Sequence, residues 1–483
     1  MATTPLNAAA HHDAHDTPMN TDTICAISTA PGVGGIAVAR VSGPQAITIV
    51  DSIWRGRRLA QVASHTAHLG DIIDTDGSTL DQALATVMRA PRSYTGEDTV
   101  EISVHGSAYV QRRLIETLIA SSARLAEPGE YTRRAFAAGN LDLAQAEAVA
   151  DLIASRSKAA HDLAVKQMRG GISQRLDQLR AKLVDLDALL ELELDFSEED
   201  VEFASRKHLK DTITQIINHI QQLHDSYNAG NAIREGFTVA IAGATNAGKS
   251  SLLNALVGDQ RAIVSDIHGT TRDIIEDTIT VGAYTFRLQD TAGIRDRAQA
   301  DTIEAIGIDR ATEALRKADI ALVLCPADSN EDARRHAVSL TRLRRRANPS
   351  AYTVLVVSKD DICDAKYCVK ALLDPLPDGI DIVAVNTVTD NGISPIYEEL
   401  EHYAKEVADS APDIMISNIR QRQALAEALA AARRVDEALT TDATLDIAAF
   451  ALRDCIEALA AVTGRISSQE VLNTIFSRFC IGK

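Results

Sequence analysis

The chain has 483 residues, of which 46% are hydrophobic and 24% charged, and its 49 basic and 67 acidic side chains give a formal net charge of −18. This length predicts about three domains with apolar cores, while the acidic balance excludes a protein that coats nucleic acid through general phosphate attraction. No apolar run reaches the roughly 18 residues of a membrane span, and six scattered cysteines indicate a reducing cytoplasm rather than a disulfide framework.

The chain opens with a polar segment, followed by a β-rich region. Residues 1–22 are rich in His, Asp and Thr and lack a signal pattern, so we predict a disordered tail. In residues 23–140, the runs ICAIS and IAVARVSG around PGVGG predict a hairpin. Gly32 and Gly34 also fit a dinucleotide fingerprint, but a β-branched run follows where that fingerprint requires a helix, so we expect no nicotinamide site.

Two helical regions flank a region in which strand and helix signals alternate. Residues 141–235 and 409–483 are predicted to be helical. A stripe of leucines three and four residues apart indicates one long helix, which either forms a coiled-coil seam or, as we favour, packs on its own domain: Leu176, Leu179, Leu183, Leu186 and Leu190. The acidic residues at 191–202 indicate a solvated helix end or, alternatively, a surface that faces a partner.

The alternating region, residues 236–408, is predicted to be an α/β domain inserted between the two helical regions. Its apolar runs predict strands buried on both faces of a largely parallel sheet: FTVAIA, TITV paired with YTFRLQ, IALVLC, TVLVVS and DIVAV.

A phosphate-binding loop follows the first of these runs. The residues GATNAGKS at 243–250 lie between FTVAIA and the helical run SSLLNAL, which is the context that this motif requires. Gly243 and Gly248 allow the backbone amides to point at phosphates. Lys249 can reach the β- and γ-phosphates, and the Ser250 hydroxyl suits Mg²⁺. This arrangement predicts a nucleoside triphosphatase.

Four further motifs follow in the order typical of GTPases. GTTRD at 269–273 can close over the γ-phosphate, and DTAG at 290–293 brings Asp290 to Mg²⁺ and the Gly293 amide to the γ-phosphate. SKDD at 358–361 ends a strand, where Asp361 can accept from N1–H and the amine of guanine. NTVTDNG at 386–392 completes the base pocket. The ordered set predicts a GTPase rather than an ATPase, although Ser358 stands where Asn is usual.

The residue after DTAG, Ile294, has no polar atom with which to orient the attacking water, a task that glutamine performs in many GTPases. Charge that develops on the phosphates also needs a cation besides Lys249 and Mg²⁺. We hypothesise that the Asn246 side-chain carbonyl and oxygens of the 265–270 loop bind K⁺ there.

Several segments together resemble the MnmE (TrmE) family, the potassium-dependent GTPases of tRNA wobble-uridine modification. They are GATNAGKSSLLNAL, SDIHGTTRD, DTAGIR, IEAIGIDRA, LDLAQAEAVADLI and the C-terminal CIGK, so the resemblance runs from about Thr23 to Lys483. It implies a multidomain α/β plus α fold. An N-terminal α+β folate-binding and dimerisation domain would occupy 23–140, a discontinuous helical domain 141–235 and 409–483, and a P-loop, Ras-like GTPase domain 236–408.

The resemblance also implies residue roles in the nucleotide site. Potassium would be bound through Asn246, Ser265, Ile267 and Thr270, and Mg²⁺ through Ser250 and Thr271, while Glu304 would position water and act with Lys249 in catalysis. The candidate GTP-binding residues are Asn246, Ala247, Gly248, Lys249, Ser250, Ser251, Ser265, Asp266, Ile267, His268, Gly269, Thr270, Thr271, Asp290, Thr291, Ala292, Gly293, Ser358, Lys359 and Asp361.

The resemblance places a tetrahydrofolate derivative, 5,10-methylene- or 5-formyl-tetrahydrofolate, on Arg40, Glu101, Asn140 and Lys483. A basic side chain can meet the glutamate tail, and Glu101 can accept from pterin N–H groups. From the residues alone, a surface arginine and a cross-strand ion pair are the alternatives for Arg40 and Glu101. Asn140 stands where the family commonly has lysine, and Cys480 is a candidate for the modification chemistry.

The sequence therefore predicts a cytoplasmic GTPase that helps to modify C5 of the wobble uridine of certain tRNAs. The resemblance implies a homodimer that joins an FAD-binding, MnmG (GidA)-like partner in a heterotetramer acting on tRNA. Two alternatives remain: a ribosome-assembly GTPase, which would typically carry a basic RNA-binding domain, and a folate-dependent one-carbon enzyme with a regulatory GTPase insert and no RNA substrate.

Overall fold

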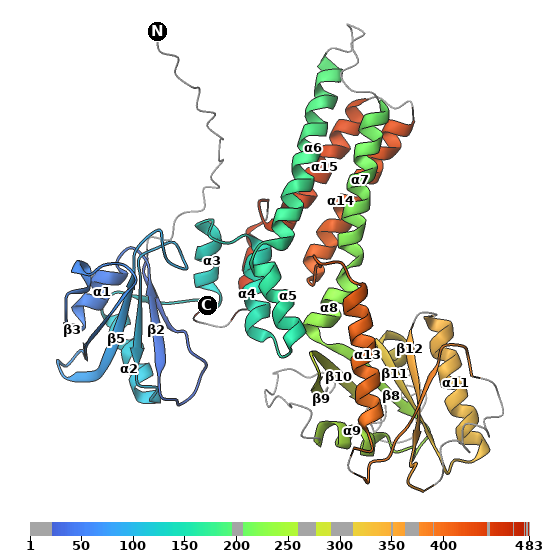
Figure 1. Ribbon diagram of the computed structural model, residues 1–483. Helices are drawn as coiled ribbons and strands as arrows, with labels where there is room; N and C mark the ends of the chain where they lie inside the picture. Colours follow the sequence, from blue (N-terminus) through green and yellow to red (C-terminus); the bar gives the residue numbers. More distant parts are fainter. Residues whose placement is uncertain are drawn as a thin grey trace, which may run out of the picture. The chain divides into compact units, whose positions relative to one another are not determined.

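A computed structural model describes residues 22–195, 206–258, 277–290, 313–348, 351–362, 376–389, 391–441, 445–466, 468–477, 479 and 482. The chain divides into two compact units, residues 1–141 together with 467–483, and residues 142–466 (Figure 1). Across the described ranges, no helix has both the length and the apolar character needed to cross a membrane.

The first unit is built on a seven-stranded sheet in the order β3-β4-β5-β6-β2-β1-β7. Its strands are β1 (Ile24–Ile27), β2 (Ala37–Ser42), β3 (Trp54–Gly56), β4 (Thr66–Ile73), β5 (Thr79–Met88), β6 (Thr99–Val104) and β7 (Arg124–Leu125). The helices are α1 (Ala46–Ser52), the 3-10 turn η1 (Leu59–Gln61), α2 (Ala108–Ala120), α3 (Glu130–Ala137) and α16 (Gln469–Phe476). The predicted hairpin is confirmed, because β1 and β2 pair antiparallel with Ile24 opposite Ser42.

Side chains on the central strands alternate between a buried face and a polar face. Ala39 and Val41 of β2 and Val100 and Ile102 of β6 are fully buried, in a core that α1 and α2 complete. The residues between them point to the opposite face, so Arg40 and its cross-strand partner Glu101 lie there. The alternation therefore puts two of the candidate folate residues side by side.

The C-terminal segment folds onto the first unit. Phe476, at the end of α16, is 2% exposed and packs against Phe136 of α3, with ring centroids 6.3 Å apart. Gly129, which precedes α3, has φ 67°, and a Cβ there would come within 2.4 Å of the Phe476 carbonyl oxygen. Near the chain end, Ser28 Oγ donates to the Gly482 carbonyl at 3.0 Å. The first unit thus needs both ends of the chain.

The second unit contains a six-stranded sheet in the order β13-β12-β11-β8-β10-β9, parallel except for the β9–β10 pair. Its strands are β8 (Phe237–Gly243), β9 (Asp277–Val281), β10 (Tyr284–Asp290), β11 (Ile320–Pro326), β12 (Tyr352–Ser358) and β13 (Asp381–Ala384). Helices α9 (Lys249–Gly258), α11 (Glu331–Ala347) and α13 (Ser394–Ser410) accompany them. All six predicted apolar runs form strands, and β8, β11 and β12 are almost wholly buried.

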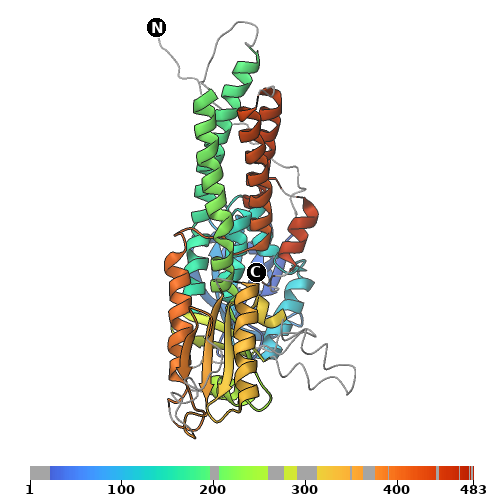
Figure 2. The same ribbon diagram turned by 90° about the vertical axis from the view of Figure 1, so that its right-hand side faces the viewer.

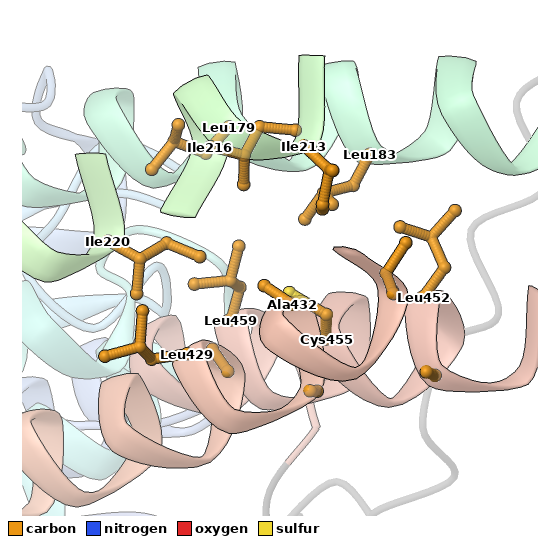
Figure 3. Close-up of a cluster of buried hydrophobic side chains, with 14 of the residues drawn as sticks. Leu179, Leu183, Ile213, Ile216, Ile220, Leu429, Ala432, Leu452, Cys455 and Leu459 are labelled. Atoms are coloured by element: carbon orange, nitrogen blue, oxygen red, sulfur yellow. The ribbon is translucent and has the colours of Figure 1, made fainter. Parts of the chain in front are cut away.

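Four long helices of the second unit, α6 (Gly171–Asp195), α7 (Arg206–Asp225), α14 (Ile419–Thr440) and α15 (Leu445–Thr463), pack side by side (Figures 1 and 2). The predicted leucine stripe lies on α6, and all five leucines are at most 2% exposed. They pack into one core with Ile213, Ile216 and Leu452 of the other helices (Figure 3). The stripe therefore packs within its own domain, as we expected.

Three shorter helices, α4 (Leu143–Ala154), α5 (Lys158–Met168) and α8 (Tyr227–Glu235), complete the second unit. The predicted fold class, α/β plus helical with an α+β N-terminal part, is confirmed.

Candidate functional site

The phosphate loop joins the central strand β8 to the start of α9. Gly243 has φ 155°, and a Cβ there would lie 2.8 Å from the Leu324 carbonyl oxygen, so the close approach of β11 requires glycine. Gly248 has φ 90° and Asn246 φ 63°. These conformations curl the loop before α9 begins at Lys249, so the first amides of that helix, which have no partner within it, face the loop.

The loop contains one polar side chain that is held by hydrogen bonds and others that are exposed. Lys249 Nζ donates to the carbonyls of Gly243 and Ala244 at 3.1 and 2.8 Å, so the ammonium group spans the loop. Asn246 and Ser250 are exposed. Their amide and hydroxyl oxygens are therefore available to a cation beside the loop, and such oxygens are the ligands that Mg²⁺ and other hard cations prefer.

Ser358 connects the end of β12 to the phosphate loop. Ser358 is 7% exposed, and its hydroxyl donates to the Ala247 carbonyl at 2.8 Å. Because β8, β11 and β12 are parallel neighbours, their carboxyl ends meet at one edge of the sheet, where ligands bind in folds of this kind. This hydrogen bond therefore connects the candidate guanine-binding motif SKDD to the phosphate loop, although serine replaces the usual asparagine there.

The other guanine-motif residues follow at the same edge. Lys359, at φ 63°, donates to both carboxylate oxygens of Asp328 at 3.3 Å, and Asp361 is exposed. In the next loop, Asn386 Oδ1 accepts from the Thr389 amide at 2.9 Å. Gly392 is packed so closely that a Cβ would lie 2.3 Å from the Asn386 carbonyl oxygen.

Several predicted site residues lie outside the described part of the chain. They are Ser265, Asp266, Ile267, His268, Gly269, Thr270, Thr271, Thr291, Ala292, Gly293, Ile294, Glu304, Cys480 and Lys483. Asp290 ends β10, which pairs with β8 in parallel, so its backbone lies next to Ile241 and close to the phosphate loop. Ala247, Gly248 and Ser251 lie in the loop and at the start of α9.

A second polar cluster lies on the face of the first unit's sheet opposite the main hydrophobic core. Arg40 Nε and Nη2 both donate to Glu101 Oε1, at 2.9 and 2.8 Å, so the cross-strand ion pair that was one alternative is present. The side chains of Arg40 and Glu101 are 20% and 30% exposed. The pair is therefore partly shielded from water yet still reachable by a ligand.

Two tyrosines hold Arg40 in place. The guanidinium carbon lies 5.5 Å from the ring centroids of both Tyr94 and Tyr131, a cation–π arrangement. Tyr131 is fully buried and its hydroxyl donates to the Arg40 carbonyl at 2.7 Å. Asn140 Nδ2 donates to the carbonyl of Tyr94 at 3.2 Å. Tyr94 therefore connects two candidate folate residues, Arg40 and Asn140.

Sequence reasoning missed both tyrosines. They lie 54 and 91 residues from Arg40 in the chain, and no local spacing relates them to it. The available signal was their position in the sequence: Tyr94 precedes the strand that carries Glu101, and Tyr131 is the second residue of the helix α3.

Among the described residues, no group of three or more His, Cys, Asp or Glu side chains is placed to bind a metal ion. The candidate cation ligands are of a different kind, since they are hydroxyl, amide and carbonyl oxygens.

Comparisons with known proteins place the chain within a family. Residues 23–140 match the model of the GTP-binding protein TrmE N-terminus, and residues 143–480 match that of the MnmE helical domain. The tRNA modification GTPase MnmE of Parabacteroides distasonis is 44% identical over 466 residues, 95% of this chain and 100% of the relative. The protein of the same name from Porphyromonas gingivalis is 43% identical, over 96% of this chain and 98% of the relative.

Among solved structures, the G domain of the T. maritima FeoB iron transporter matches 35% of this chain and 98% of its own length, with 25% identity. The TM-score of that match is 0.25, which is too low to establish a shared fold.

Proposed function

The chain belongs to the MnmE (TrmE) family of tRNA modification GTPases, and we propose that it helps to install a carboxymethylaminomethyl-type group on C5 of the wobble uridine of certain tRNAs. The observation that carries this proposal is the phosphate loop at the end of β8, within a chain of which 95% matches a tRNA modification GTPase over that relative's full length. The GTPase and tRNA-modification predictions are thereby confirmed. The finer assignments below are proposals.

In the nucleotide site, the loop amides and Lys249 bind the phosphates. The Lys249 ammonium, already directed across the loop, exchanges its bonds with the Gly243 and Ala244 carbonyls for phosphate oxygens. Ser250 and Thr271 would hold Mg²⁺, which would supply positive charge to the phosphates. Asp361 accepts from the guanine N1–H and amine, and Ser358 holds the base-binding loop against the phosphate loop.

Asn246 would hold K⁺ beside the phosphates, where the ion would supply positive charge in place of a catalytic arginine. Asn246 is exposed and held at φ 63° in the loop, a conformation that only glycine and asparagine adopt readily, which supports a role for its side-chain oxygen in a defined position. Ser265, Ile267 and Thr270 complete the ligand set. Because Ile294 cannot orient water, we assign that task to Glu304.

A tetrahydrofolate derivative binds at Arg40, Glu101, Asn140 and Lys483, where it supplies the one-carbon unit. Because Arg40 and Glu101 are bonded to each other, they serve the same part of an elongated ligand. Glu101 accepts from the pterin N–H groups, while the two hydrogen bonds from Arg40 orient that carboxylate. We therefore assign Lys483 to binding the glutamate tail of the folate. Cys480 lies three residues before Lys483 in the chain.

The bonding of the C-terminal segment supports this assignment. Gly482 bonds to Ser28, which follows β1, and Ala26 of β1 is the cross-strand partner of Arg40. Gly482, the residue before Lys483 in the sequence, therefore lies close to the strand next to the ion pair.

In the cell, the protein works in the cytoplasm as a homodimer, together with an FAD-binding, MnmG-like partner and tRNA. GTP hydrolysis drives a cycle of approach and separation of two GTPase domains, and the uridine chemistry takes place away from the phosphates.

The test is mass spectrometry of tRNA nucleosides from a strain that lacks the gene. We expect the wobble uridines to lose the C5 substituent, and a plasmid copy to restore it, whereas a copy carrying Lys249→Ala should not. Fully modified wobble uridines in the deletion strain would refute the proposal and favour a role in ribosome assembly or in folate chemistry alone.

A further inference from the structure

The helix α11 carries the densest positive charge in the chain. Residues 333–359 contain six arginines, one histidine and one lysine, and no aspartate or glutamate, in a protein of net charge −18. All six arginines lie on α11 and none of its residues is lysine. A concentration of guanidinium groups in an otherwise acidic chain calls for a physical explanation.

Packing sets one of these arginines, Arg344, apart from the others. The inner side of α11 packs against β11 and buries Ala337, Val338 and Thr341 together with Arg344. Arg344 is structural, because its guanidinium donates to the carbonyls of Arg316 and Ala318. Figure 1 shows α11 at one side of the sheet, beside β11 and β12.

The opposite side of the helix carries a stripe of positive charge. Positions 335, 339, 342 and 346 follow the i, i+4, i+7, i+11 spacing that aligns side chains on one face. Arg335, Ser339 and Arg346 are exposed, and Arg342 is half-buried. At 1.5 Å per residue, the stripe is about 16 Å long. We call these four residues the arginine face.

Helix stability alone does not account for the arginine face. Cations near the C-terminus favour a helix, but Arg335 lies in the second turn, where the macrodipole disfavours positive charge. Arg342 and Arg346 are like charges four residues apart, which costs a few tenths of a kcal/mol. Arg335 does pair with Glu331, yet an exposed pair of this kind contributes little and can exchange for another anion.

We propose that the arginine face binds the phosphate backbone of tRNA. This proposal rests on the tRNA-modifying function proposed above and adds a surface that holds the substrate. Arginine donates two parallel hydrogen bonds to a phosphate, and the Ser339 hydroxyl can donate a further one. The face carries no aromatic side chain for base stacking, so its contacts position the RNA without reading its sequence. The acidic remainder of the chain repels RNA and directs it to this face.

The test measures the affinity of the full-length protein for an unmodified tRNA transcript by fluorescence anisotropy, over a series of salt concentrations. The variant R335Q/R342Q/R346Q removes three charges from the arginine face. The matched control R206Q/K207Q/K210Q removes three from the first turns of α7 and leaves the same net charge.

We expect the arginine-face variant to bind the transcript at least about tenfold more weakly than the control, and its plot of log affinity against log salt to be shallower by about 2 to 3, one contact per arginine. Both variants should hydrolyse GTP at the wild-type rate, because neither touches the nucleotide site.

Equal affinity of the two variants would overturn the proposal, and so would a wild-type protein that binds the transcript without salt dependence. If the arginine-face variant kept its affinity for the transcript and lost binding to a partner protein, the arginine face would bind an acidic protein instead of tRNA. These outcomes are independent of the nucleoside analysis of the deletion strain, so the two proposals fail separately.

Discussion

At the scale of single residues, Asn246 and Ser358 have distinct tasks around the phosphate loop. Asn246 is exposed at φ 63°, whereas Ser358 is buried and donates to the Ala247 carbonyl. One side chain is available to a ligand and the other holds the loop that the ligand contacts. A buried hydrogen bond of the second kind contributes about 1 kcal/mol, so we assign Ser358 to positioning and Asn246 to the cation.

The cation assignment leads to a prediction for Asn246→Ala. The wild-type protein should hydrolyse GTP faster in K⁺ than in Na⁺, with Rb⁺ intermediate or similar to K⁺. The variant should hydrolyse GTP slowly and at the same rate in all three salts, because it lacks the side-chain oxygen ligand. Loss of charge stabilisation in a transition state typically costs about 10² to 10³ in rate.

The matched control is Thr245→Ala, an exposed neighbour in the same loop. It should keep the dependence on K⁺. Wild-type hydrolysis that proceeds equally fast in Na⁺ and K⁺ would contradict the potassium assignment, and the GTPase assignment would stand without it.

At the scale of elements, α4 explains the motif LDLAQAEA that dominates the family resemblance. Asp142 caps the helix by accepting from the Gln145 amide, and the Gln145 side chain returns a bond to the Asp142 amide, which forms a capping box. Leu143 is fully buried. Glu147, 6% exposed, accepts from Arg420 at 2.8 and 2.9 Å. The motif therefore stabilises the fold, because it caps α4 and binds α4 to α14.

The buried pair predicts a large effect of Glu147→Gln. The Arg420 guanidinium would lose its counter-charge in a nearly dry site, and breaking such a pair from one side costs about 3 to 5 kcal/mol. We expect a marked drop in the melting temperature of the second unit, measured by differential scanning calorimetry. Glu427→Gln changes an exposed glutamate on α14 and should have little effect. Equal changes in melting temperature for the two variants would show that the Glu147–Arg420 pair is not needed for stability.

Helix α4 also carries Asp151, a carboxyl group whose pKa is raised. Burial raises the pKa of Asp151 to about 6, against the opposing attraction of Arg234 on α8, whose Nη1 lies 3.2 Å from Oδ1. The unfolded chain releases this proton near pH 4, whereas the folded chain keeps it up to about pH 6. The free energy of unfolding should therefore fall by up to about 3 kcal/mol as the pH rises from 4 to 6.

Asp151→Asn should remove that fall, because asparagine does not titrate. Melting temperatures of the two proteins at pH 4.5 and pH 7 give the comparison, and the exposed Asp185→Asn on α6 is the control. If Asp151→Asn and the wild type respond to pH identically, the raised pKa of Asp151 is wrong.

The elements also show what the sequence could and could not predict. The strands of the GTPase sheet were predictable because strands buried on both faces form continuous apolar runs. The leucine stripe was predictable because a helix buried on one face repeats apolar residues with a period of 3.6. The phosphate loop was predictable because its chemistry lies within eight consecutive residues. The stacking of Arg40 between Tyr94 and Tyr131, and the bond between Glu147 and Arg420, join residues far apart in the chain. No local pattern specifies such contacts.

At the scale of the whole molecule, the first unit depends on the C-terminal segment. Phe476→Ala removes a ring that contacts Phe136 and closes the core beside Gly129. A truncation of this kind costs about 3 to 5 kcal/mol. We expect weaker binding of 5-formyl-tetrahydrofolate, measured by isothermal titration calorimetry, with unchanged binding of GTP in the second unit.

Val471→Ala, at a partly exposed position on the same helix, is the matched control and should bind folate normally. Normal folate binding by Phe476→Ala as well would show that the attachment of α16 and the folate site are independent.

The bond between Ser28 and Gly482 spans 454 positions of the chain. During synthesis, the ribosome translates the strands of the first unit's sheet early. It must then translate the chain as far as residue 482 before the C-terminal segment can pack on that sheet. A truncated mRNA, or a nascent chain that is released early, would give a first unit that lacks its C-terminal segment. Completion of this unit therefore requires that translation has passed residue 482.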